Sequence, residues 1–135
     1  MKKIITFLVV SVSIVSLFSF QRKSKFDLKA SIVRGKDVYT TYCMSCHQEQ
    51  GEGIEDIYPP LSKSDYLMAD INRSIIQVLK GVNEEMKVNG KTYATEMVGL
   101  DLSSEETSDV LNYIRNSFGN KGEAVTPTMV TSLKN

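Results

Sequence analysis

The chain of 135 residues is long enough for one globular domain and too short for two independent hydrophobic cores. Its 16 basic and 16 acidic residues cancel to a formal net charge of zero. This balance excludes the basic surface that nucleic-acid-binding proteins use, so we expect protein or small-molecule partners and no nucleic acid.

The first 20 residues have the composition of an export signal. Lys2 and Lys3 form a basic start, and the run from 4 to 20 holds apolar and hydroxyl-bearing residues without any charge. We expect residues 1–20 to be a signal peptide or, if uncleaved, an N-terminal anchor that associates the protein with the membrane. Either outcome predicts an exported protein, periplasmic or anchored on the outer side of the cytoplasmic membrane.

Residues 21–29 carry four basic residues and predict a solvated linker. After the linker, hydrophobic periodicity predicts helices rather than strands. The first helix covers 30–42, a short one covers 64–68, and a third covers 69–80, with Asp70 as its N-cap and Gly81 as its stop.

The clearest helical signal follows Leu102. Ser103 and Glu106 form a capping box, in which each side chain accepts from the other residue's backbone N–H. Apolar residues follow at helical spacing, and Gly119 predicts a left-handed stop. We expect residues 121–135 to be a C-terminal tail beyond this last helix.

Two long loops separate the predicted helices, at 48–62 and 81–102, and we expect no strand after residue 20. Loops of this length are uncommon in a domain this small. They are explained if they wrap a large group that is not protein. The sequence therefore predicts an all-α domain over 30–120 built around a bound cofactor.

Both cysteines and the only histidine lie within five consecutive positions, as Cys43, Cys46 and His47. A disulfide across two intervening residues closes a very small loop and stabilises little, and a thioredoxin-like redox pair requires a parallel sheet. In an exported chain, C-x-x-C-H is instead the attachment signature of c-type haem. Two thiols on one helical turn add to the two vinyl groups of the porphyrin, and the histidine binds iron.

With this motif, the chain resembles the small single-haem class I cytochromes c over residues 30–120. The family has a glycine eight residues before the first haem cysteine and an aromatic residue halfway between, and Gly35, Tyr39 and Cys43 have that spacing here. The resemblance implies the cytochrome c fold, in which the N- and C-terminal helices cross. We expect the glycine to permit the crossing, against Val110 and Tyr113.

The resemblance also implies the second protein ligand of the iron and a partner for His47. Pro59 is expected to accept a hydrogen bond from the second ring nitrogen of His47 through its carbonyl, with Leu61 packing on the haem. Met97 is expected to ligate the iron together with His47, and Met86 is the alternative. Many relatives have proline directly after the ligand methionine, where this chain has Val98.

Three further residues are candidates for contact with the haem propionates or the ring edge, namely Tyr66, Arg73 and Tyr93.

A six-coordinate His/Met iron has no open position for a substrate, so we expect a one-electron carrier and not an enzyme. The resemblance implies redox partners such as an oxidase, a copper nitrite reductase or a dehydrogenase. The alternatives are a sensor of nitric oxide or carbon monoxide, or a haem enzyme subunit, each with a labile sixth ligand.

The attachment motif leads to a first prediction. After acid extraction under denaturing conditions, the protein should retain its haem, and its mass should exceed that of the processed chain by one haem. Cys43→Ser should weaken attachment, and His47→Ala should prevent a stable holoprotein because the proximal bond is lost. Haem that extracts freely from the wild-type protein would contradict covalent attachment.

Overall fold

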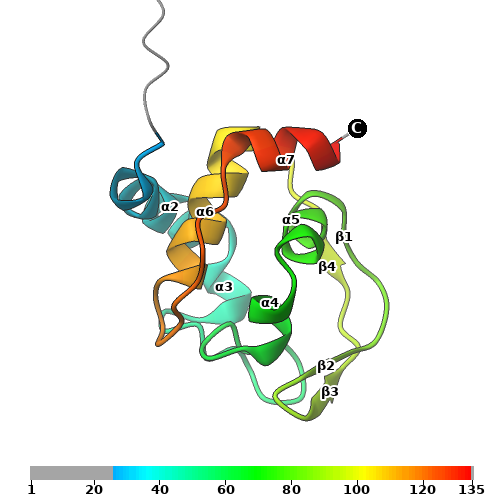
Figure 1. The fold of residues 1–135 in the computed structure, drawn as a ribbon. Coiled ribbons are helices and arrows are strands. Elements are labelled where there is room, and N and C mark those ends of the chain that lie inside the picture. The colour runs from blue at the N-terminus through cyan, green and yellow to red at the C-terminus, as the bar shows by residue number, and fades with distance from the viewer. Residues whose placement is uncertain (1–25, 135) are drawn as a thin grey trace, which may run out of the picture.

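A computed structural model describes residues 26–134 of the protein (Figure 1). The predicted signal peptide or anchor lies outside the described residues, and so does most of the predicted linker. The described helices are α2 (Leu28–Tyr42), α3 (Met44–His47), α4 (Asp65–Ala69), α5 (Ile71–Lys80), α6 (Ser104–Arg115) and α7 (Pro127–Lys134). None of these helices combines the length and the apolar composition that a membrane crossing requires.

The crossing of α2 over α6 is the main helix–helix contact of the fold (Figure 1). A side chain on Gly35 would overlap the backbone carbonyl of Asp109 and approach the Cβ of Tyr113 to 2.9 Å. The expected role of Gly35 at the crossing is confirmed, and so is its contact with Tyr113. The backbone contact lies at Asp109, one residue before the expected Val110.

A buried polar network ties the same two helices together. The Asp109 carboxylate accepts from the Ser31 hydroxyl at 2.5 Å and from two nitrogens of Arg34 at 2.6 and 2.8 Å. Asn112 donates from its amide to Ser31 and to the Val125 carbonyl, and accepts from the Val125 N–H at 2.7 Å. The carboxylate is therefore compensated although it is almost fully buried.

The helix ends agree with the predicted caps except at one position. Asp70 accepts from the Arg73 N–H, and Ser103 and Glu106 make the complete capping box. However, α6 ends at Arg115 and Asn116 is its C-cap, so Gly119 is not the helix stop. Gly119 does have a left-handed φ of 80° and follows Phe118 at 57°, so it belongs to the turn after the helix.

The expectation of no strand is wrong, because the described part of loop 81–102 contains two small antiparallel pairs. Strand β1 (Gly81–Val82) pairs with β4 (Met97–Val98), and β2 (Met86–Val88) pairs with β3 (Lys91–Tyr93). Between β2 and β3, Asn89 and Gly90 both have positive φ, as a tight hairpin turn requires. Strands of two or three residues are too short to show an alternating pattern in the sequence.

The expectation of a tail after the last predicted helix is also corrected, because residues 127–134 form α7. This helix packs on α5 and α6 (Figure 1). Val125 and Val130 are fully buried, and Lys134 donates to the Leu102 carbonyl at 2.9 Å. The eight residues of α7 hold few apolar positions, so only their packing on the core identifies the helix as part of the domain.

The helix crossing gives the second prediction. Gly35→Ala should lower the free energy of unfolding of the holoprotein by roughly 3 kcal/mol, because overpacking of the Asp109 backbone outweighs the ~1 kcal/mol that alanine gains in helix propensity. The midpoint of guanidinium chloride unfolding measures this loss. Lys36→Ala, at the exposed neighbouring position, is the control and should change stability by less than about 0.5 kcal/mol. An equal effect of the two variants would rule out the close crossing.

Candidate haem site

The two cysteines lie on the turn where α2 ends and α3 begins. The N–H of Cys43 donates to the Tyr39 carbonyl at 2.9 Å, so Cys43 ends α2, and the N–H groups of Cys46 and His47 both donate to the Cys43 carbonyl. Cys43 is buried and Cys46 is half-buried. Burial raises the pKa of the Cys43 thiol to about 11, and the nearby Cys46 adds to that shift.

His47 is held by the hydrogen bond that the sequence predicts. Its Nδ1 lies 3.0 Å from the Pro59 carbonyl oxygen. Because a carbonyl only accepts, Nδ1 carries the proton in the neutral ring, and the lone pair of Nε2 remains for a metal. Burial lowers the pKa of His47 below its ordinary value, although the bond to Pro59 opposes that shift, so the neutral, metal-binding form is favoured.

The loop that follows His47 (48–62, the histidine loop) folds back on itself and brings Pro59 to the imidazole. Gly53 donates its N–H to the His47 carbonyl at 3.0 Å, and the N–H of Leu61 donates to the Gly51 carbonyl at 2.7 Å. Gly53 has a φ of 68°, and a side chain there would overlap the Tyr58 carbonyl and come within 2.8 Å of the Pro59 oxygen. Glycine is therefore required at position 53 for the loop to carry Pro59 this close.

Three aromatic rings pack against one another and contact the start of this loop. Tyr39, Tyr113 and Phe118 have ring centroids 5.2–5.4 Å apart, and the Tyr39 hydroxyl donates to the Gln48 carbonyl at 2.6 Å. A side chain on Gly51 would meet the Phe118 ring at 2.6 Å. The helix crossing and the histidine loop are thus packed against the same cluster.

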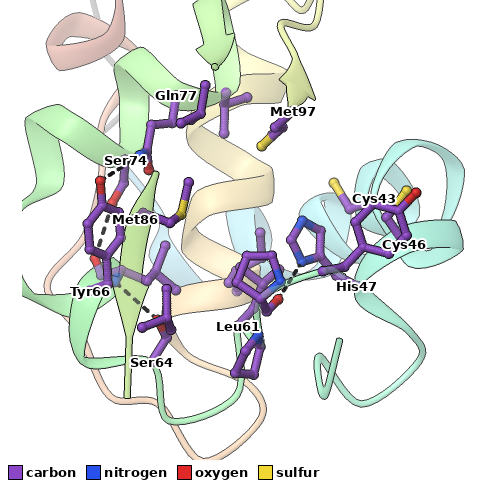
Figure 2. Close-up of a pocket in the computed structure, with 18 of the residues that line it drawn as sticks. Cys43, Cys46, His47, Leu61, Ser64, Tyr66, Ser74, Gln77, Met86 and Met97 are labelled. Atoms are coloured by element: carbon purple, nitrogen blue, oxygen red, sulfur yellow. Dashed lines mark hydrogen bonds between the residues drawn. The ribbon is translucent and has the colours of Figure 1, made fainter. Parts of the chain in front are cut away.

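One mainly apolar cavity of about 380 Å³ brings all the predicted site residues together. Cys43, Cys46, His47, Pro59 and Met97 all line it. Figure 2 shows the imidazole of His47 and the sulfur atoms of Met86 and Met97 directed into this cavity. Leu61 also lines the wall, as expected.

The two methionines reach the cavity from different strands. Met97 on β4 pairs with Val82 on β1, and two residues after β4 the Leu100 N–H donates to the Val78 carbonyl at 2.9 Å. Met86 on β2 lies opposite Tyr93 on β3. Met86 therefore lies on the first strand of a hairpin.

Residues at the tip of the β2–β3 hairpin are held by hydrogen bonds and ion pairs. Asn89 and Asp65 exchange two hydrogen bonds, of 2.7 and 3.0 Å, between side-chain oxygens and backbone N–H groups. Lys91 forms ion pairs with Glu55 and Asp56 of the histidine loop at 2.9 and 2.8 Å. The ion pairs of Lys91 connect the two long loops, and the Asn89–Asp65 hydrogen bonds connect the hairpin to the start of α4.

Comparison with known proteins identifies the family. A model of the cytochrome c family matches residues 32–118, more than half of the chain. The chain belongs to the cytochrome c family. Cytochromes c bind haem c covalently, so the cofactor of this cytochrome is a haem c, and Cys43 and Cys46 stand in a C-x-x-C-H motif.

The relatives include small cytochromes and subunits of larger enzymes. This cytochrome is 32% identical over 105 residues to the cytochrome c subunit of a quinone alcohol dehydrogenase from Gluconacetobacter polyoxogenes, covering 76% of this chain and 22% of that subunit. It is 32% identical over 90 residues to cytochrome c-552 from Thermus thermophilus, covering 63% of this chain and 68% of the relative. It is 24% identical over 105 residues to a fructose dehydrogenase cytochrome subunit from Gluconobacter japonicus, covering 74% of this chain and 22% of that subunit. The chain thus spans about a fifth of the dehydrogenase subunits that it matches.

The cavity of this cytochrome fits a haem in three respects. Its lining is mostly apolar, it places both thiols at one edge, and His47 presents an imidazole nitrogen that has no hydrogen-bond partner within residues 26–134. The bound haem iron supplies one-electron chemistry by cycling between its ferric and ferrous states. The chain holds the imidazole in one tautomer through the Pro59 carbonyl.

The weaker candidates are placed differently. Tyr66 lines the cavity and its hydroxyl accepts from Gln77 at 3.0 Å, whereas Arg73 stacks on the Tyr66 ring with its guanidinium carbon 3.7 Å from the centroid. Tyr93 is buried in the hairpin and is not part of the cavity wall. Gln77 also lines the cavity and was not predicted from the sequence, although it lies one turn after Arg73 on the predicted helix.

The size of the cavity gives the third prediction. Without haem, the apolar wall of this cavity of about 380 Å³ would be exposed to water, and a small domain is too marginally stable to lose that burial. We therefore expect the apoprotein to be largely unfolded and haem binding to supply the folding free energy. Circular dichroism and thermal melting of haem-free protein test this. A native-like spectrum with a cooperative transition would contradict it.

Proposed function

We propose that this cytochrome c domain carries single electrons outside the cytoplasmic membrane, with His47 and Met97 as the axial ligands of its haem iron. Electron transfer, rather than catalysis, is the role of the cytochrome c family to which the chain belongs.

The observation that carries the ligand proposal is the convergence of His47 and Met97 on one cavity from opposite loops (Figure 2). His47 is oriented by Pro59. Met97 lies on β4, which pairs with β1, and β1 begins at Gly81 directly after α5. Close backbone contact supports the position of that strand, because a side chain on Gly99 would come within 2.7 Å of the Leu79 carbonyl. The thioether of Met97 is a soft ligand that stabilises ferrous iron and raises the reduction potential.

The residues around the cavity favour a carrier over an enzyme. The chain has no second histidine to act as a distal acid or base, since His47 is the only one in the sequence. If His47 and Met97 both hold the iron, they would leave it no position for a substrate. The protein then contributes the burial of the haem, the geometry of the iron ligands and an accessible haem edge.

The relatives support a dehydrogenase as the redox partner. Two of them are named as cytochrome subunits of a quinone alcohol dehydrogenase and of a fructose dehydrogenase. We propose that this domain accepts electrons from a dehydrogenase of that general kind, with an oxidase or a nitrite reductase as other partners of the same chemistry. Tyr42 and Val98 line the cavity and are 49% and 74% exposed, so they offer apolar contact for a docking protein near the cofactor.

The proposed compartment depends on residues 1–20. Their basic start and uncharged run support export, and thioether attachment of haem to a C-x-x-C-H motif agrees with a location outside the cytoplasm. Expression of the full chain followed by cell fractionation and N-terminal sequencing identifies the compartment and the cleavage point.

The ligand assignment is the fourth prediction, and the two cavity methionines make a matched pair. Met97→Ala should abolish the weak red absorption band of the sulfur–iron bond in the ferric protein and lower the reduction potential. It should also open the iron to carbon monoxide or cyanide, because the soft sixth ligand is lost. Met86→Ala should leave all three properties nearly unchanged. Optical spectroscopy and potentiometry measure these effects.

Two outcomes would overturn parts of the proposal. A full effect of Met86→Ala, with none from Met97→Ala, would move the axial ligand to Met86 and leave the carrier function intact. Ready binding of carbon monoxide by the wild-type protein would contradict the closed site itself. The labile sixth ligand of a gas sensor or a haem enzyme would then replace the carrier interpretation.

A further inference from the structure

Acidic residues are concentrated on the two long loops that form much of the haem cavity. The histidine loop and the loop 81–102 together carry eight acidic and two basic residues, a formal net charge of −6. The other residues between 26 and 134 carry eight acidic and nine basic residues, a formal net charge of +1. All eight loop carboxylates are exposed. The loops around the haem cavity are therefore strongly negative, whereas the rest of the described chain is nearly neutral.

Most of these loop carboxylates have no cation beside them. Lys91 pairs with Glu55 and Asp56, so one of the two loop cations already serves two carboxylates. The other six loop carboxylates form no ion pair within residues 26–134. Their charge is therefore available to attract a positively charged molecule from solution.

Three of the unpaired carboxylates lie beside Met97, at the mouth of the haem cavity. Glu96 lines the cavity itself and directly precedes Met97. Glu84 and Glu85 follow Val82, which pairs with Met97 across β1 and β4. Because this pair is antiparallel, the segment after β1 and the segment before β4 leave the strand pair at the same end. The three carboxylates therefore belong to one edge of the cavity.

Exposed apolar side chains accompany these carboxylates. Val98, at the end of β4, is 74% exposed, and Tyr42, at the end of α2, is 49% exposed. Both side chains also line the cavity. An apolar centre that charged residues surround is typical of a protein–protein interface. We call the surface formed by Tyr42, Val98, Glu84, Glu85 and Glu96 the cavity rim.

Two lysines lie near the cavity rim without neutralising it. Lys87 follows Met86 on β2, and successive side chains of a strand point to opposite faces, so Lys87 points away from the cavity that Met86 lines. Lys80 ends α5 and precedes Gly81, which pairs with Val98. Neither lysine forms an ion pair within residues 26–134. The three rim carboxylates outnumber the two lysines, and the histidine loop adds further negative charge.

We propose that the cavity rim docks a redox protein whose contact face is basic, with lysine or arginine side chains around its own redox centre. This inference rests on the proposed electron-carrier function and specifies the charge of the partner. Opposite charges steer the two proteins together and orient the rim toward the partner, while Tyr42 and Val98 supply apolar contact. Because surface charges are screened beyond about 10 Å at 0.1 M salt, docking weakens as the ionic strength rises.

The fifth prediction uses the reduced holoprotein and two small oxidants of opposite charge. Tris(phenanthroline)cobalt(III) is a cation and ferricyanide is an anion, and each takes one electron from the ferrous haem. As the ionic strength rises from ~0.01 M to ~0.5 M, the stopped-flow rate should fall about threefold or more for the cobalt complex. The rate with ferricyanide should rise over the same range, because salt screens its repulsion from the rim.

Charge variants locate this effect at the cavity rim. The combined change Glu84→Gln, Glu85→Gln and Glu96→Gln should slow the cobalt reaction about fivefold at low ionic strength and speed the ferricyanide reaction. Glu96→Gln alone should slow the cobalt reaction about twofold. Glu123→Gln is the matched control, because it removes the same charge from an exposed residue that does not line the haem cavity. It should leave both rates nearly unchanged.

Two further measurements separate docking from other effects of the rim variants. Hexalysine is a probe of a basic contact face, and at constant ionic strength it should slow the cobalt reaction of the wild type but not that of the triple variant. The weak red absorption band of the ferric protein should be the same in every variant. A lost band would assign the change in rate to a displaced iron ligand and overturn the docking role of these carboxylates.

Other outcomes would also overturn the proposal. Equal effects of Glu96→Gln and Glu123→Gln would assign the effect to the net charge of the protein and not to the rim. A cobalt rate that rises with ionic strength would indicate a rim that repels cations and suits an acidic partner. In both cases the haem still releases its electron, so the carrier function stands. Failure of both oxidants to react with the ferrous haem would overturn the carrier function, and the docking proposal with it.

Discussion

The close approach of α2 to α6 at Gly35 is the constraint on which the rest of the structure depends. Because no side chain separates Gly35 from the Asp109 backbone, the two helices share the buried Ser31–Asp109–Asn112 network. The position of α2 in turn fixes where it ends, and its C-cap is Cys43. The first haem cysteine is thus placed by a helix contact two turns earlier in the chain, rather than by the loop that contains the motif.

From Cys43 onward, the site is built by loops that hold one another. The histidine loop depends on Gly53 to bring the Pro59 carbonyl to His47, and on Gly51 to pack against Phe118. The other long loop carries the two cavity methionines on short strands, and its hairpin is tied to Asp65 and to the acidic pair Glu55–Asp56. These surface ion pairs contribute little free energy individually, so contacts of the apolar cavity wall with the bound haem must supply most of the free energy that holds the loops together.

The segment after α6 packs over the core. The side-chain amide of Asn112 binds the Val125 backbone through both its nitrogen and its oxygen, and α7 then packs on α5 and α6 with Val130 buried. On its way, this segment passes over Arg115 at Gly122, which helps to bury the guanidinium.

The family, the cofactor and the local helix signals follow from the amino-acid sequence alone. The C-x-x-C-H motif is contiguous, and the caps at Asp70 and Ser103 act within one turn, so neither needs tertiary information. The spacing from Gly35 to Cys43 also located the helix crossing. The remaining features depend on tertiary contacts. The strands around Met86 and Met97 are too short for a periodic pattern, and α7 depends on the core it covers. The burial of Arg115 depends on contacts between segments far apart in the chain, which no local pattern records.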